Sequence, residues 1–224
     1  MREKINVLDV NIEYCSAKKA LKAAVEYMDT PATSVIDLVT IEALMYARDD
    51  QGYREAIEQS DLVLPGQKDI LEAAGITDSR SIRETASQTF LRLWLKYLHR
   101  NHCRVYLLVE TDEEVDALTG CLTEEYRGIA IVGVDKVAPG TEADDMLVNA
   151  INGGEADCVI AILTPPVQEQ FIARNRSQIN TRVWLGAGKL MEFAYRQKSG
   201  KGKVMTFLDR MLFRREIEKT KKES

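Results

Sequence analysis

The chain has 224 residues, of which 45% are hydrophobic and 29% charged, and its net charge is −5. This length and composition are typical of a soluble globular chain with a substantial core, and they fit a single α/β domain. The acidic balance argues against general nucleic-acid binding, which calls for a basic face and a recognisable motif. We therefore expect no nucleic-acid partner.

No segment resembles a signal peptide, and no apolar run reaches the roughly 18 residues that span a bilayer. We therefore expect a cytoplasmic protein. His99 and His102 have no Cys or His partner at metal spacing. Cys103 and Cys158 fall in strand-like runs, which favours buried free thiols. The pattern predicts neither a metal site nor a cofactor.

The first half of the chain alternates strand-like and helix-like patterns. Residues 4–15 predict a strand or hairpin with a turn at Asn11, and Ser16 can cap the helix that Pro31 ends. The next elements are a strand, two short helices, a short strand, a short helix and a long helix, at residues 34–40, 42–50, 51–59, 61–64, 69–74 and 81–99. The long helix has a buried stripe of Phe90, Leu91, Trp94, Leu95 and Leu98.

The second half repeats this alternation more plainly. Strands are predicted at residues 104–109, 129–134, 158–163 and 181–185, with helices at residues 113–126 and 142–151 and a further helix after Pro166. Strands that alternate with helices of this length indicate βαβ units and a largely parallel sheet flanked by helices. We expect one α/β domain at residues 1–197, followed by a basic helical arm at residues 198–224.

Strand gives way to helix within residues 156–176, where an apolar run ends at Thr164 and two prolines. The first turn of the following helix carries Gln168 and Glu169. Ligands bind at such corners of open α/β sheets because backbone N–H groups and helix N-termini point there. The alternative is that Glu169 only complements the helix dipole while Gln168 is solvated.

The arm differs in charge from the body. Residues 196–224 carry ten Lys or Arg and four Asp or Glu, a balance of +6, which leaves −11 for residues 1–195. One helical face of the arm is apolar, and it consists of Val204, Phe207, Leu208, Met211 and Leu212. Basic residues around that face suit a phosphorylated ligand or an anionic membrane surface. The alternative is a helix docked on the domain or on another subunit of a homo-oligomer.

Three stretches, in this order, resemble the WecG/TagA/CpsF family of glycosyltransferases. They are SDLVLPG from Ser60, the P-x-Q-E-x-x-I-A-R-N-R run from Pro166, and GAGKLMEF from Gly186. The resemblance covers nearly the whole chain and implies a Rossmann-like fold. It also implies transfer of an N-acetylhexosamine, such as N-acetylmannosamine, from a UDP-sugar to an undecaprenyl-diphosphate-linked acceptor in bacterial cell-wall or surface-polysaccharide synthesis. An arginine-rich arm over the active site would place such a protein at the inner face of the cell membrane.

The chain departs from the family at positions that carry chemistry. The family's proposed general base is the aspartate of a P-D-G motif, and Gly66 stands there. General-base assistance typically supplies about 10²–10⁴-fold in rate. Asp69 and Glu169 are the candidate replacements, and a solvated or capping acid is the alternative for Asp69. Two family glycines read Val109 and Glu110, which adds bulk and negative charge where phosphates would lie.

The resemblance also supplies candidates for substrate binding. They are Thr40, Arg83, Gln168, Gly186, Gly188, Glu192, Arg210, Arg214 and Arg215. In the last motif the family's alanine corresponds to Leu190.

Two functions stay open at this point. One is a divergent glycosyltransferase; the other is a catalytically inactive homologue that binds a partner, a lipid-linked sugar or a sister enzyme without turnover.

Overall fold

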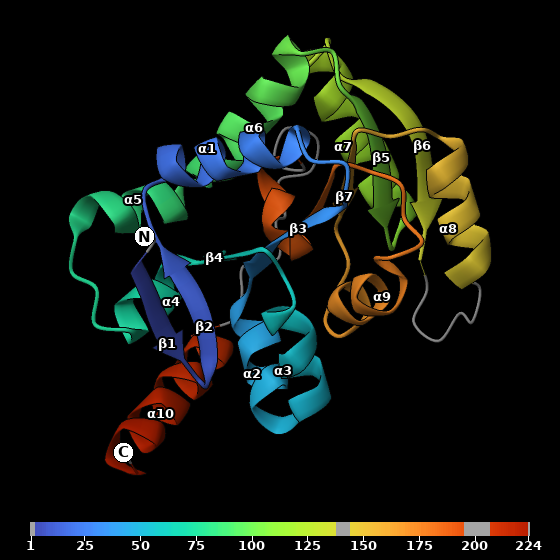
Figure 1. Ribbon diagram of the computed structural model, residues 1–224. Helices are drawn as coiled ribbons and strands as arrows, with labels where there is room; N and C mark the ends of the chain where they lie inside the picture. Colours follow the sequence, from blue (N-terminus) through green and yellow to red (C-terminus); the bar gives the residue numbers. More distant parts are fainter. Residues whose placement is uncertain (1–2, 138–143, 195–206, 224) are drawn as a thin grey trace.

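The computed structural model describes residues 3–137, 144–194 and 207–223. Six parallel strands form a central sheet in the order β4-β3-β8-β7-β5-β6 (Figure 1). They are β3 (Ser34–Val39), β4 (Leu62–Pro65), β5 (Arg104–Val109), β6 (Ala130–Lys136), β7 (Cys158–Ala161) and β8 (Val183–Gly186). The α/β class and the Rossmann-like parallel sheet are confirmed.

Helices cover both faces of the sheet. One face carries α1 (Ala17–Met28), α6 (Thr89–Arg100) and α7 (Asp112–Glu125), and the other carries α2 (Ile41–Asp49), α3 (Gln51–Glu58), α8 (Asp144–Gly153) and α9 (Val167–Asn175). Successive strand residues point to opposite faces. In β3, Ile36 and Leu38 join the core under α1 and α6, whereas Val35 and Val39 join the cores on the other side.

A separate antiparallel hairpin, β1 (Glu3–Val7) and β2 (Val10–Tyr14), lies beside β4. Leu8 and Asp9 form its turn with φ of 51° and 63°, the positive values that a tight two-residue hairpin requires. The turn predicted at Asn11 was wrong. Asn11 instead pairs across the hairpin with Asn6, whose side-chain nitrogen donates to Asn11 Oδ1 at 3.2 Å.

The single long helix predicted at residues 81–99 was also wrong. The chain forms α4 (Lys68–Ala73), α5 (Ser79–Ala86) and then α6, with Gln88 in the left-handed region between the last two (φ 53°). Gln88 Nε2 donates to the carbonyl of Gly66 at 2.9 Å, a tertiary contact that local periodicity does not encode. None of the α5 residues is buried, so the apolar stripe begins only at Phe90.

The arm contains a helix, α10 (Phe207–Glu223), which lies beside α2 and α4 (Figure 1). Phe213 and Ile217 are buried against these helices and the hairpin. Met211 and Leu212, which we placed on the apolar face, are 50% and 49% exposed. The boundary predicted between residues 197 and 198 lies outside the described residues, so the division into domain and arm stays a prediction.

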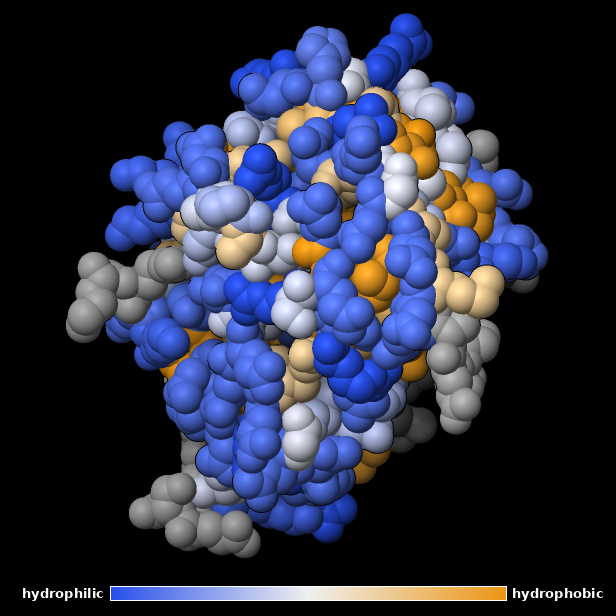
Figure 2. All heavy atoms as spheres, turned by 45° about the vertical axis from the view of Figure 1, so that its right-hand side comes forward, coloured by the Kyte–Doolittle hydropathy of each residue, from blue (hydrophilic) through white to orange (hydrophobic). Residues whose placement is uncertain are grey.

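The surface shown in Figure 2 is mostly hydrophilic, and its apolar side chains form small separate patches. The four cysteines are free thiols, and three of them are buried. Within the described ranges no helix combines the length and the apolar character needed to cross a bilayer. In the same ranges, no group of three or more His, Cys, Asp or Glu side chains is arranged to hold a metal ion.

Candidate functional site

A buried polar cluster lies where the carboxyl ends of β3 and β8 meet the first turn of α9. Gln168 is its centre and is 2% exposed. Its Nε2 donates to Glu169 Oε1 at 3.1 Å and, at 3.4 Å, to Asp37 Oδ1, while its Oε1 accepts from the backbone N–H of Gly188 at 3.1 Å. The alternative of a solvated Gln168 was therefore wrong, because the side chain is hydrogen-bonded to β3, to α9 and to the loop after β8.

Two acids in this cluster are almost fully buried. Asp37 is 2% exposed and Glu169 is 4% exposed. Burial raises the pKa of Asp37 well above its ordinary value, and the nearby charge of Glu169 adds to the shift. Burial also raises the pKa of Glu169. Both changes favour the protonated carboxylic acid, because a charged group loses its hydration in the interior.

Tyr53, from α3, completes the cluster on the side of α2 and α3. Burial and the two neighbouring acids raise the pKa of its phenol. A side-chain hydrogen bond with Glu169 contributes to this shift, and the same bond offsets part of the rise in the pKa of Glu169. Among the described residues, Asp37 Oδ2 has no hydrogen-bond partner. A buried oxygen without a partner is unusual, because most buried polar groups are satisfied.

Gly186 and Gly188, two of the predicted binding residues, leave space for the side chains of this cluster. A Cβ on Gly186 would lie 2.6 Å from Gln168 Nε2 and 3.0 Å from Asp37 Oδ1. Gly188 has a φ of 49°, a left-handed value, and a Cβ there would lie 3.3 Å from Thr40 Cγ2. Thr40 caps α2 by accepting from the backbone N–H of Ala43 at 3.1 Å. The structure thus brings together Thr40, Gln168, Glu169 and the two glycines, and their role in ligand binding stays a prediction.

The space beside Gly66, where the resemblance places the family's aspartate, is filled. A Cβ on Gly66 would overlap the Leu190 Cδ1 atom and would lie 2.6 Å from the carbonyl oxygen of Val39. Asp69, the nearer candidate replacement, lies in the first turn of α4 and is only 7% exposed. The alternative of a solvated Asp69 was wrong, and its role as a base stays a prediction.

Three further candidates, Arg83, Arg214 and Arg215, lie on α5 and α10. Arg83 is exposed on α5, where its Nε donates to the carbonyl of Ser79 at 3.2 Å. Arg214 and Arg215 are exposed on α10, and Arg214 lies 3.5 Å from Glu72. The side chains of Glu192 and Arg210 are outside the described part of the chain. The structure therefore gives Arg83, Arg214 and Arg215 no shared site with Gln168.

A cavity of about 40 Å³ lies on the opposite side of β3 and β4, between α1, α5 and α6. Its apolar floor includes Leu38, Leu64 and Phe90, and Ser81, Glu84 and Gln88 add polar groups. Its lining does not include Gly66, Thr40, Arg83 or Gln168. This cavity is therefore not a pocket shared by those four residues.

A second polar cluster lies at the carboxyl ends of β5 and β7. Lys189 Nζ is 2.7 Å from Glu110 Oε2 and 2.6 Å from Glu114 Oε1, and it also donates to the carbonyl of Ile162 at 3.1 Å. Burial alone would raise the pKa of Glu110, but hydrogen bonds from Lys189 and Thr164 outweigh it and hold that pKa below its ordinary value. Glu110 is therefore a carboxylate in this cluster.

Sequence reasoning missed Asp37, Tyr53 and Lys189. Asp37 carried a signal, because it is the one charged residue in the apolar run of β3. A charge in a strand buried at every position calls for a partner or a function. Tyr53 and Lys189 gave no local signal, because they reach their clusters only through the packing of α3 and of the loop after β8.

The arginines at the end of the α9 motif have structural roles. Arg176 donates to the carbonyls of Thr33 and Gln59 at 2.9 and 3.0 Å, and its Nη2 lies 2.6 Å from Asp61 Oδ2. It therefore joins α9 to the start of β3 and the end of α3. Arg174 is more exposed and pairs with Asp144.

A doubly wound parallel sheet with polar clusters at the carboxyl ends of its strands is the arrangement in which α/β proteins bind ligands. The model of the glycosyl transferase WecG/TagA/CpsF family matches residues 5–205, and the chain belongs to this family. It is 23% identical over 195 residues to a protein of Staphylococcus aureus strain NCTC 8325 / PS 47, a match that covers 84% of this chain and 74% of that protein. A protein of strain MRSA252 is 22% identical with the same coverage. Both are named N-acetylglucosaminyldiphosphoundecaprenol N-acetyl-beta-D-mannosaminyltransferase.

Proposed function

We propose that this protein acts in lipid-linked cell-wall or surface-polysaccharide synthesis as a family member that binds its partner without transferring a sugar. The partners in this proposal are those of the transferase relatives, an undecaprenyl-diphosphate-linked sugar and a UDP-N-acetylhexosamine. Membership of the glycosyltransferase family supports the setting. The residues at the strand ends support the loss of transfer.

The closed space at Gly66 is the observation that carries the proposal. Transfer to a sugar hydroxyl needs a carboxylate or imidazole within hydrogen-bond reach of the proton it removes. Gly66 has no side chain, and Leu190 together with the Val39 carbonyl fills the space in which one would lie. Glu169, the other candidate base, is 4% exposed and already accepts a hydrogen bond from Gln168, so its carboxyl is not open to a sugar hydroxyl.

A transfer assay tests the proposal directly. The full-length protein is incubated with UDP-N-acetylmannosamine and an N-acetylglucosaminyl-diphosphate-prenyl acceptor, and UDP release is measured beside the Staphylococcus aureus relative as the active control. We expect no release above the rate without protein. In parallel, the acceptor is expected to raise the melting temperature, because a ligand that binds only the folded state stabilises it.

A divergent active transferase is the second candidate, and the Asp37–Gln168–Glu169 cluster favours it. A carboxyl whose pKa is raised by burial is a common property of catalytic acids and bases. Under this candidate UDP is released, and Glu169→Gln abolishes the release while the protein stays folded. Such a result would refute the proposal of a non-catalytic member.

The arm provides the proposed contact with the membrane. Met211 and Leu212 are half-exposed beside the exposed Arg214 and Arg215. Apolar and basic side chains together suit an anionic lipid surface. Sedimentation with anionic vesicles tests this peripheral contact, and light scattering of the purified protein tests the alternative of a homo-oligomer.

A further inference from the structure

The second polar cluster lies at a special place in the sheet. Strands β5 and β7 are parallel neighbours. The loop after β5 leads to α7 on one face of the sheet, whereas the loop after β7 leads to α9 on the other face. Loops that leave neighbouring strands toward opposite faces open a crevice between them, and ligands of doubly wound proteins bind in such crevices.

The carboxylate of Glu110 lies at the carboxyl ends of these two strands and is bound there as an anion would be. Thr164 donates to Glu110 Oε1 twice, from its backbone N–H at 2.5 Å and from its hydroxyl at 2.7 Å. Lys189 Nζ lies 2.7 Å from the other oxygen, Oε2. A backbone N–H, a hydroxyl and an ammonium that converge on one anion are the donors that proteins also use for phosphate groups.

Backbone N–H groups beside this site also bind a carboxylate, that of Glu114. Glu114 Oε2 accepts from the backbone N–H groups of Glu110 and Thr111, at 2.7 and 3.2 Å. Its Oε1 accepts from Lys189 Nζ at 2.6 Å. Glu114 side-chain exposure is 11%, whereas that of Glu110 is 17% and that of Lys189 is 33%. Glu110 and Lys189 are therefore the members that solvent and a ligand can reach.

We propose that Glu110 is an internal occupant of an oxyanion site formed by Thr164 and Lys189, and that this site binds a phosphate group once Glu110 leaves it. Two carboxylates and one ammonium give the cluster a charge of −1, which repels a phosphate. Removal of the Glu110 carboxylate makes the cluster neutral and frees three donors. Because Glu110 is tethered, its high effective concentration excludes weak anions from the natural protein. This inference does not rest on the absence of sugar transfer.

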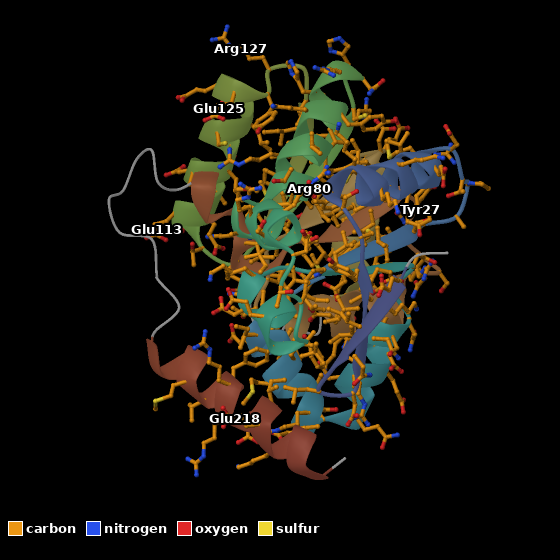
Figure 3. The ribbon with its side chains drawn as sticks, turned by 90° about the vertical axis from the view of Figure 1, so that its left-hand side faces the viewer. Tyr27, Arg80, Glu113, Glu125, Arg127 and Glu218 are labelled. Atoms are coloured by element: carbon orange, nitrogen blue, oxygen red, sulfur yellow. The ribbon has the colours of Figure 1, made fainter. Side chains whose placement is uncertain are left out.

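The test compares the binding of inorganic pyrophosphate to four proteins by isothermal titration calorimetry. They are the natural protein, Glu110→Ala, Glu110→Ala combined with Lys189→Ala, and the control Glu113→Ala. Glu113 is exposed on the neighbouring turn of α7 (Figure 3). We expect Glu110→Ala to bind at least about ten times more tightly than the natural protein, which corresponds to about 1.4 kcal/mol. The double variant and Glu113→Ala are expected to match the natural protein.

A second variant, Glu110→Gln, still tests the proposal if Glu110→Ala does not fold. Glu110→Gln removes the charge but keeps an oxygen that can accept from Thr164, and it is expected to bind pyrophosphate more tightly than the natural protein. Titrations of both Glu110 variants with UDP and with a prenyl diphosphate in micelles then distinguish a nucleotide from a lipid as the source of the phosphate. The proposal is overturned if both variants fold and bind pyrophosphate no better than the natural protein. It is equally overturned if the double variant keeps the gain.

Discussion

Leu190 packs its Cδ1 atom into the space that a side chain on Gly66 would need. The resemblance to the family places its aspartate at Gly66 and its alanine at Leu190. Under that correspondence a side chain is removed on one side of the contact and enlarged on the other, which keeps the interior filled at the density of a protein core. The Leu190 side chain thus fills the space beside Gly66.

Restoring the carboxylate is therefore expected to fail. Gly66→Asp forces Leu190 to move and brings the new Cβ against the Val39 carbonyl, 2.6 Å away in the present backbone. Overpacking of this kind costs about 1–3 kcal/mol in free energy of unfolding. Urea unfolding measures that loss, and the transfer assay is expected to show no UDP release.

Gly153→Ala is the matched control for Gly66→Asp, because an added Cβ there meets no atom within 4 Å. It should leave the free energy of unfolding within about 1 kcal/mol of the natural value. The steric account would be wrong if Gly66→Asp were as stable as this control.

The buried acids predict an unusual pH dependence. The folded-state pKa of Asp37 is raised, so the folded protein binds a proton that the unfolded chain releases above pH 4. Stability from this group is present at low pH and falls as pH rises toward the folded pKa, by at most about 1.4 kcal/mol per pH unit. The amide side chain in Asp37→Asn cannot ionise, so the variant does not lose free energy of unfolding in this way as pH rises. We expect the stability of the variant relative to the natural protein to increase as pH rises above the unfolded pKa of about 4.

Urea unfolding at several pH values measures this difference between variant and natural protein. Taking the difference matters because other carboxylates, such as Glu110 and Glu84, have lowered pKa values and act in the opposite direction. Asp116→Asn, at an exposed position on α7, is the control for the replacement of a surface carboxyl by an amide. A constant difference for Asp37→Asn would show that the carboxyl is ionised in the folded protein.

The polar cluster around Gln168 shows what local pattern can predict. Residues after β3, after β7 and after β8 meet because the carboxyl ends of parallel strands share one edge of the sheet. Thr40, Gln168 and Gly186 therefore come together as the order of elements requires. Arg83 does not join them. The helix that carries it, α5, ends at Ala86, and Gln88 then has a left-handed backbone and a side-chain bond to the carbonyl of Gly66. That bond joins residues 22 positions apart, which a periodicity over one helix does not include.

The two arginines of the α9 motif are expected to differ in their effect on stability. Arg176 makes three hydrogen bonds that join α9 to the carbonyls of Thr33 and Gln59 and to Asp61. Hydrogen bonds to charged groups contribute about 1.5–3 kcal/mol each, and the partial exposure of Arg176 reduces this. We expect Arg176→Ala to lower the free energy of unfolding by about 2 kcal/mol.

Arg174→Ala is the comparison for Arg176→Ala. Arg174 has a side chain that is 58% exposed and pairs with Asp144 at the surface. Surface ion pairs contribute about 0–1 kcal/mol, so the loss should be small. Equal losses for the two variants, measured by urea unfolding, would contradict the structural role that we assign to Arg176.

The docking of α10 depends on the side of the helix that carries Phe213 and Ile217. Phe213 is fully buried, whereas its neighbour Leu212 is 49% exposed. Loss of a buried Phe side chain typically costs about 3–5 kcal/mol, which exceeds the stability of many terminal segments, so Phe213→Ala should release α10 from the body. Hydrogen exchange followed by mass spectrometry is expected to show faster exchange in residues 207–223 and little change in the sheet. Leu212→Ala should exchange as the natural protein does. If the two variants exchanged alike, the helix would be held by its ion pairs, such as that between Arg48 and Glu216, rather than by its apolar side.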